Sequence, residues 1–162
     1  MGIVEYLREL NMVSLLFRLI LALAAGGILG LERARKRNPA DSRTYMMVCI
    51  GAALAMILGQ YLFYMLTDSW ASVSLEVGVI TDVSRFGAQV INGIGFLGAG
   101  IILVNGRQQV TGVTTSAGLW AAACTGLAIG AGFYECVFIV VILMVVVMRL
   151  LPIIEDVLLE SA

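Results

Sequence analysis

Residues 82–100 combine side chains that could bind or react with a sequence apolar enough to cross a membrane. Asp82, Arg85, Gln89 and Asn92 supply a carboxylate, a guanidinium and two amides. A helix turns about 100° per residue, which places these side chains in one stripe about 100° wide. Because polar groups are costly in hydrocarbon unless the protein satisfies them, the stripe predicts either a packing seam joined by amides or a site facing the bundle interior.

Four glycines occupy the same stretch, and they predict that a neighbouring helix approaches closely. They are Gly93, Gly95, Gly98 and Gly100. Residues 93–98 also match the GxGxxG pattern of dinucleotide-binding proteins. That pattern requires a preceding strand in a βαβ unit, which an apolar spanning segment does not provide, so we reject the dinucleotide interpretation.

The composition indicates an integral membrane protein. Of 162 residues, 60% are hydrophobic and 13% are charged, whereas soluble domains carry about 25% charged residues. A net charge of -1 gives no basic surface for nucleic acid. The sequence has no histidine, P-loop, nucleophile elbow or HExxH motif. We therefore expect no enzymatic activity, no cofactor and no nucleic-acid partner, and the sequence identifies no metal site.

Three cysteines lie in or beside apolar stretches, at positions 49, 124 and 136. An odd number of cysteines without CxxC spacing predicts neither a disulfide framework nor a zinc site. Free cysteine behaves as a small hydrophobic residue. We therefore expect all three to be packing residues.

Five apolar segments predict an all-α polytopic protein with about five transmembrane helices. Each is close to the roughly 20 residues that a spanning helix needs. They cover residues 12–31, 45–66, 86–104, 113–132 and 133–151. The last two form either a tight helical hairpin or a single interrupted unit. We expect one domain, with an interfacial helix in residues 1–11, the bundle in residues 12–151 and a short cytoplasmic tail in residues 152–162.

The basic residues predict the orientation of the chain in the membrane. The loop after the first segment contains four arginines and a lysine, at positions 33, 35, 36, 37 and 43, whereas the next loop is mainly acidic. The positive-inside rule places the first loop in the cytoplasm. Five crossings then put the N-terminus outside and the C-terminus inside. The basic cluster is interpreted as a topology signal attracted to anionic lipids, with a ligand site as the alternative.

Small residues on the first segment predict a groove where another helix packs. Ala22, Gly26 and Gly30 recur every four residues, in line with Arg18 and Arg33. We expect Arg18 to extend its side chain toward the lipid headgroups. Glu135, near the outer end of the fifth segment, is expected to need no partner.

The arrangement of these residues resembles the MgtC/SapB family of bacterial inner-membrane proteins. The matching residues are Gly26, Gly30, Glu32, Arg33, Arg43, the run 88–100 with Asp82 and Arg85 before it, and residues 112–120, which include Thr114, Thr115 and Trp120. Two departures stand out. Longer members carry a cytoplasmic ACT-like domain after the last helix, and from this sequence we expect no regulation through such a domain; in addition, Thr114 stands where some relatives have asparagine.

The resemblance implies a cytoplasmic-membrane protein linked to growth under magnesium limitation and, in pathogens, to survival inside host cells. Members similar to MgtC are thought to act on other membrane machinery, including the rotary ATP synthase, instead of pumping magnesium. We therefore expect an accessory or regulatory role in ion homeostasis. A small transporter or channel for magnesium or another cation, using the stripe that begins at Asp82, is the alternative.

The number of small-residue seams also predicts self-association, most simply as a two-fold dimer within the lipid bilayer. Asp82 and Arg85 are three residues apart on a helix, so we expect them to form a structural ion pair. The glycines, threonines and Trp120 named above are the candidate helix-interface or partner contacts.

Overall fold

The computed structural model describes residues 2–34, 41–78, 81–104 and 110–160. It is built almost entirely of helices, with one small β-hairpin. In chain order the elements are α1 (Ile3–Arg8), α2 (Met12–Ala34), α3 (Ser42–Tyr64), the π-helical turn η1 (Met65–Ser69), α4 (Ala71–Val77), α5 (Ser84–Ile101), β1 (Leu103–Val104), β2 (Val110–Thr111), α6 (Val113–Ala131) and α7 (Tyr134–Glu160).

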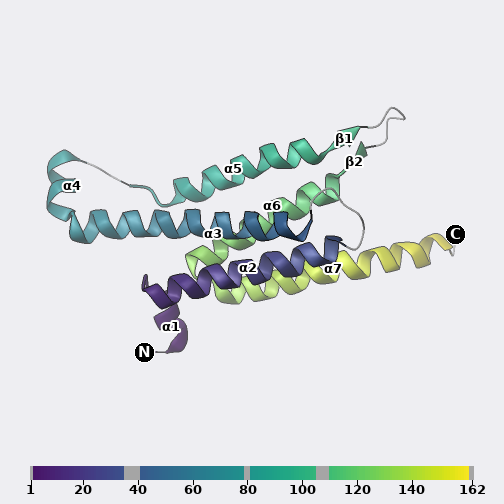
Figure 1. The fold of residues 1–162 in the computed structure, drawn as a ribbon, viewed down its shortest axis with the longest axis horizontal. Helices are drawn as coiled ribbons and strands as arrows, with labels where there is room; N and C mark the ends of the chain where they lie inside the picture. Colours follow the sequence, from purple (N-terminus) through teal and green to yellow (C-terminus); the bar gives the residue numbers. More distant parts are fainter. Residues whose placement is uncertain (1, 35–40, 79–80, 105–109, 161–162) are drawn as a thin grey trace.

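The five long helices run alternately in opposite directions (Figure 1). One end of the bundle carries α1, α4 and the turn between α6 and α7. The other end carries the end of α2, the start of α3, the β-hairpin and the end of α7. β1 and β2 pair antiparallel, with Leu103 opposite Thr111 and Val104 opposite Val110. The hairpin therefore reverses the chain between α5 and α6.

Four helices of the described chain are long and apolar enough to cross a membrane. They are Met12–Leu31, Ser42–Ser69, Val113–Ala131 and Tyr134–Pro152. The all-α membrane fold predicted from composition is therefore confirmed. The fifth predicted crossing corresponds to α5, whose polar residues set it apart from these four, so the number five stays a prediction. The last two segments form separate helices, joined at Gly132, whose φ of +83° lies in the left-handed region that glycine adopts readily.

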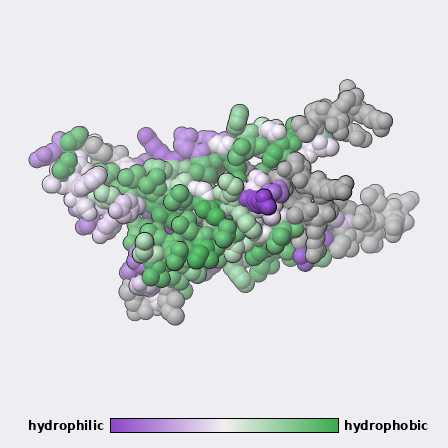
Figure 2. All heavy atoms as spheres, viewed as in Figure 1, coloured by the Kyte–Doolittle hydropathy of each residue, from purple (hydrophilic) through white to green (hydrophobic). Residues whose placement is uncertain are grey.

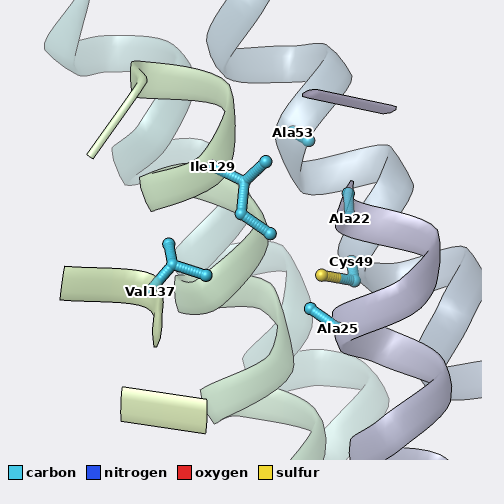
Figure 3. Packing of buried hydrophobic residues seen from close by; sticks show 6 residues of the cluster. All are labelled: Ala22, Ala25, Cys49, Ala53, Ile129 and Val137. Atoms are coloured by element: carbon cyan, nitrogen blue, oxygen red, sulfur yellow. The ribbon is translucent and has the colours of Figure 1, made fainter. Parts of the chain in front are cut away.

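Small residues hold α2, α3 and α6 together at the centre of the bundle. A Cβ built at Gly26 would lie 2.7 Å from the carbonyl oxygen of Tyr45, and one at Gly130 would lie 2.5 Å from that of Ala53. Figure 3 shows the adjoining apolar cluster, to which α2, α3, α6 and α7 all contribute; its labelled members are Ala22, Ala25, Cys49, Ala53, Ile129 and Val137. Close backbone approach is how helices associate in membranes, where burial of apolar surface gives little drive.

α5 packs on the α3 and α6 side of this centre. Ile94 clusters with Ala52 and Ala123, which lie near the midpoints of α3 and α6. At one end of α5, Phe86 lies against Gly59 of α3, and at the other end Gly98 lies against Ser116 of α6. α5 therefore runs alongside two of the candidate membrane spans for its whole length.

Candidate functional site

The predicted polar stripe lies on the outward face of α5. Arg85, Gln89 and Asn92 are exposed, as are Gly93, Phe96 and Gly100, which helical periodicity places on the same side of α5. Figure 2 shows a hydrophilic patch over the beginning of α5, on a surface that is otherwise mostly hydrophobic. Of the two alternatives for the stripe, a site facing the bundle interior does not fit the single chain, and a packing seam toward another chain stays a prediction. The buried side of the helix carries Ile94 and Gly98 instead.

Asp82 forms hydrogen bonds at the start of α5. The expected ion pair between Asp82 and Arg85 is absent from the described residues. The Asp82 carboxylate accepts hydrogen bonds from Ser84 N at 2.9 Å and Ser84 Oγ at 2.6 Å. These hydrogen bonds hold the pKa of the Asp82 carboxyl below its usual value, and the charge of Arg85 adds a smaller effect. A carboxylate near a helix N-terminus satisfies amides that the helix leaves unpaired, so its role here is local.

The four glycines at positions 93, 95, 98 and 100 of α5 divide into two groups. A Cβ at Gly98 would collide with the Ser116 hydroxyl, which confirms close approach at that position. Gly93, Gly95 and Gly100 have nothing within 4 Å of the position where a Cβ would stand. Their backbone is therefore open to a neighbour from outside the chain.

Of the other candidate contact residues, Gly26, Gly30 and Thr115 lie at helix contacts. Gly30 approaches Ser42, and the buried Thr115 accepts a hydrogen bond from the Tyr45 hydroxyl through its carbonyl oxygen at 3.3 Å. Arg43, Thr114 and Trp120 are exposed. The side chains of Glu32 and Arg33, and residues 35–37 of the basic cluster, lie outside the described residues.

The cysteines differ in their packing. Cys49 is buried in the cluster between α2, α3 and α6, Cys124 is half-buried, and Cys136 is exposed on α7. The packing role predicted for the three is thus confirmed for Cys49, whereas Cys136 contributes to the outer surface.

The largest fully buried side chain in the described part of the protein is that of Arg18 on α2, which is 0% exposed. The expectation that it reaches toward the headgroups is wrong. Its Nη1 donates to the Gly130 carbonyl oxygen at 2.8 Å and to Gln60 Oε1 at 3.0 Å, and its Nε donates to the Tyr134 hydroxyl at 3.2 Å. Its Nη2 donates to the Arg8 carbonyl oxygen at 2.7 Å and to the Leu7 carbonyl oxygen at 3.2 Å.

These acceptors come from four helices, so the Arg18 guanidinium joins α2 to α1, α3, α6 and α7 at one end of the bundle. Tyr134 completes the cluster by donating its hydroxyl to the Leu7 carbonyl oxygen at 2.6 Å. Among the described residues, none of the Arg18 acceptors is a carboxylate. The cation is stabilised instead by carbonyl oxygens at the C-terminal ends of α1 and α6, where helix dipoles favour positive charge.

A second arginine lies beside this cluster at the surface. Arg8 forms an ion pair with Glu135, with Nη2 2.7 Å from Oε1, and its Nε donates to the Gly132 carbonyl oxygen at 3.4 Å. The expectation that Glu135 needs no partner is therefore wrong. Both side chains are about half exposed, so the pair contributes little to stability compared with the buried Arg18.

The sequence contained a signal for the Arg18 cluster. Arg18 lies four residues before Ala22, on the same face as Gly26 and Gly30. Those small residues predicted the packing face of α2, so a side chain in line with them points inward. Gln60 and Tyr134 gave no comparable signal, since their roles depend on how α3 and α7 are placed around α2.

Comparison with known proteins identifies the family that the sequence motifs resemble. The model of the MgtC family matches residues 19–157. The chain is 42% identical over 120 residues to an Escherichia coli K12 protein named "Putative magnesium transporter YhiD", a match that covers 74% of this chain and 52% of that protein. It is 33% identical over 139 residues to SapB of Bacillus subtilis, covering 86% of this chain and 57% of SapB.

Protein MgtC of Brucella abortus is 33% identical over 130 residues, covering 80% of this chain and 48% of that relative. The chain thus spans about half the length of the curated relatives it matches. No solved structure matches the chain.

Proposed function

Since the chain belongs to the MgtC family, we propose that it is an accessory or regulatory membrane protein in magnesium-linked ion homeostasis, which acts through helix contacts and does not carry the ion itself. The magnesium link comes from the name of the Escherichia coli relative. The proposal includes residence in the bacterial cytoplasmic membrane, with the basic loop inside, as the positive-inside rule favours.

The buried charge of Arg18 is the observation that carries this proposal. A cation that entered the bundle at this end would approach a guanidinium that is held by oxygen acceptors from four helices, none of which is a carboxylate among the described residues. Like charges repel strongly where the surroundings are poor in water. The buried arginine thus holds the helices of the single chain together, and its charge makes this end of the bundle poorly suited to the passage of a divalent cation.

The direction of the α5 side chains gives further support. Magnesium in proteins is bound by one or two carboxylates while it keeps several waters. The carboxylate of Asp82 is occupied by Ser84, and Gln89 and Asn92 face outward from α5. Outward amides at a helix surface are suited to hydrogen bonds with another helix.

Magnesium transport is the second candidate, favoured by the name of the Escherichia coli relative. The accessory role and magnesium transport can be distinguished with purified protein in liposomes that contain a fluorescent magnesium indicator. We expect the rate of magnesium entry to equal that of protein-free liposomes, with an ionophore as the positive control. Saturable entry that Asp82→Asn abolishes would establish transport and overturn the proposal.

The accessory role itself is tested in cells. A strain that lacks the gene should grow poorly at low magnesium, and the native chain should restore growth. An Asn92→Leu variant present in the membrane at the native level should restore growth incompletely, because it removes an outward amide. Leu143→Ala, on the exposed face of α7, is the matched control and should restore growth fully. Equal restoration by both variants would argue against a role for α5 contacts.

A further inference from the structure

We propose that the outward face of α5 is the contact surface for a second copy of this chain, in a two-fold dimer whose axis runs along the membrane normal. We define this α5 face by its six exposed residues, which are Arg85, Gln89, Asn92, Gly93, Phe96 and Gly100. The inference concerns assembly and does not depend on the proposed function.

The first step is the depth of the α5 face in the membrane. Ile94 packs between Ala52 and Ala123, near the midpoints of α3 and α6. Asn92 is two residues from Ile94, and Gln89 is about one further turn along the helix. Both amides therefore lie within the hydrocarbon if α3 and α6 span the membrane, whereas Arg85 lies closer to the end of the bundle.

The second step is the state of these amides in the single chain. Within the described residues, neither the Gln89 nor the Asn92 side chain has a hydrogen-bond partner. Lipid chains offer no donor or acceptor, so an unsatisfied amide in hydrocarbon is strongly destabilising. A protein surface must therefore cover this face of α5 when the chain is in the membrane.

The third step is the identity of that surface. A two-fold axis along the membrane normal sets each residue opposite itself at the same depth. The amide of Asn92 both donates and accepts, so it can pair with the same amide of a second copy. Gly93 and Gly100 leave the backbone open to close approach, and Phe96, which is 84% exposed, gains a neighbour.

A shallow groove beside the α5 face provides room for the side chains of the second copy. It lies between α3 and α5, has a volume of about 560 Å³, and is lined by Ala55, Arg85, Phe86, Gln89 and Val90. Gln89 thus belongs both to the face and to the wall of the groove. A second copy seated on α5 would cover this amide together with that of Asn92.

Disulfide cross-linking in membranes tests the contact directly. The three native cysteines are replaced by alanine, and one cysteine is introduced by Asn92→Cys. Under mild oxidation we expect cross-linked dimers at least tenfold more abundant than for Phe138→Cys, the matched control on the outer face of α7, where Phe138 is 70% exposed. Equal cross-linking at the two positions would overturn the inference, as would adducts of Asn92→Cys with another protein only.

The mass of the protein in nanodiscs gives a second measurement that does not depend on cysteine chemistry. We expect twice the 17.3 kDa chain mass for the native protein. The dimer of the double variant Gln89→Leu with Asn92→Leu should dissociate into monomers at protein concentrations at least tenfold higher than those at which the native dimer dissociates. Its helical content should be unchanged, because both side chains point away from the bundle. A native monomer, or a double variant as dimeric as the native chain, would refute the α5 contact.

Discussion

Arg18 Nε donates a hydrogen bond to the hydroxyl of Tyr134 at 3.2 Å, although 116 residues separate the two in the chain. The same hydroxyl donates to the Leu7 carbonyl oxygen. One polar cluster therefore connects the first described helix to the last. Because the Arg18 side chain at the centre of the cluster is fully buried, the loss of its donors leaves acceptors with poor access to water.

Arg18→Ala should therefore destabilise the protein strongly. The change leaves the Gly130 and Arg8 carbonyl oxygens and the Gln60 amide without their donor. A buried polar group without its partner costs about 1 to 3 kcal/mol, so we expect a loss of about 3 kcal/mol or more, measured as a lower melting temperature in detergent.

Arg8→Ala is the matched control for this prediction. It removes an arginine at the edge of the same cluster, but the ion pair with Glu135 is about half exposed. Exposed ion pairs contribute about 0 to 1 kcal/mol, so the melting temperature should change little. Equal effects of the two changes would contradict the distinction between a buried and an exposed arginine.

Gly126→Ala should also destabilise the bundle. A Cβ at this position would collide with the carbonyl oxygen of Cys49 and lie 2.9 Å from Cβ of Ala52. Forcing extra atoms into a packed interior costs about 1 to 3 kcal/mol. Gly51→Ala on α3 meets nothing within 4 Å and should leave the melting temperature unchanged or raise it slightly. A tolerated Gly126→Ala would show that the α3 and α6 backbones can separate without penalty.

Labelling from outside the cell should distinguish the two ends of the bundle. In a chain without native cysteines, Ser72→Cys on α4 should react with an impermeant thiol reagent, because α4 lies at the end opposite the end of α2 and the start of α3, which flank the basic loop in the sequence (Figure 1). Thr111→Cys in β2, at the same end as the start of α3, should react only after the membrane is opened. The reverse pattern would invert the orientation predicted by the positive-inside rule.

The start of α3 should respond to acid through Asp41. Thr44 donates to the Asp41 carboxylate from its backbone N and from Oγ1, each at 3.0 Å, and these bonds lower the pKa of the carboxyl. Because the folded pKa is depressed, the contribution is fully present above the usual value of 3.8 and is lost as the pH falls through the lower, folded value.

Hydrogen exchange at the Thr44 amide measures this effect. Corrected for intrinsic exchange, protection should fall in strongly acidic solution in the native chain, whereas Asp41→Ala should show weaker protection with no such step. A native profile without a step would mean that Asp41 does not cap α3.

The sequence predicted the helices well because hydrophobic length and the need to pair every backbone group restrict a membrane segment to few structures. It also predicted the packing role of Gly26 and Gly30, since small residues repeated every four positions lie on one helix face. The β-hairpin, η1 and α4 were not predicted, because short elements at the ends of a bundle have little periodicity.

Side-chain direction was harder to predict. Periodicity placed Asn92 and Gln89 on one face of α5, but it does not tell which face of a helix the neighbours cover. In α5 the packing face is set by Ile94, Gly87 and Gly98, and the amides lie on the opposite side. Asp82 and Arg85 have the spacing of an ion pair, yet Ser84 is nearer in sequence and offers two donors to the carboxylate.

The Arg18 cluster also has a consequence for biosynthesis. When α2 leaves the ribosome, neither Gly130 nor Tyr134 has yet been made, so the first long helix enters the bilayer before α6 and α7 can supply these two acceptors of Arg18. A charge is costly in hydrocarbon, so water or lipid headgroups must solvate the guanidinium until those helices arrive.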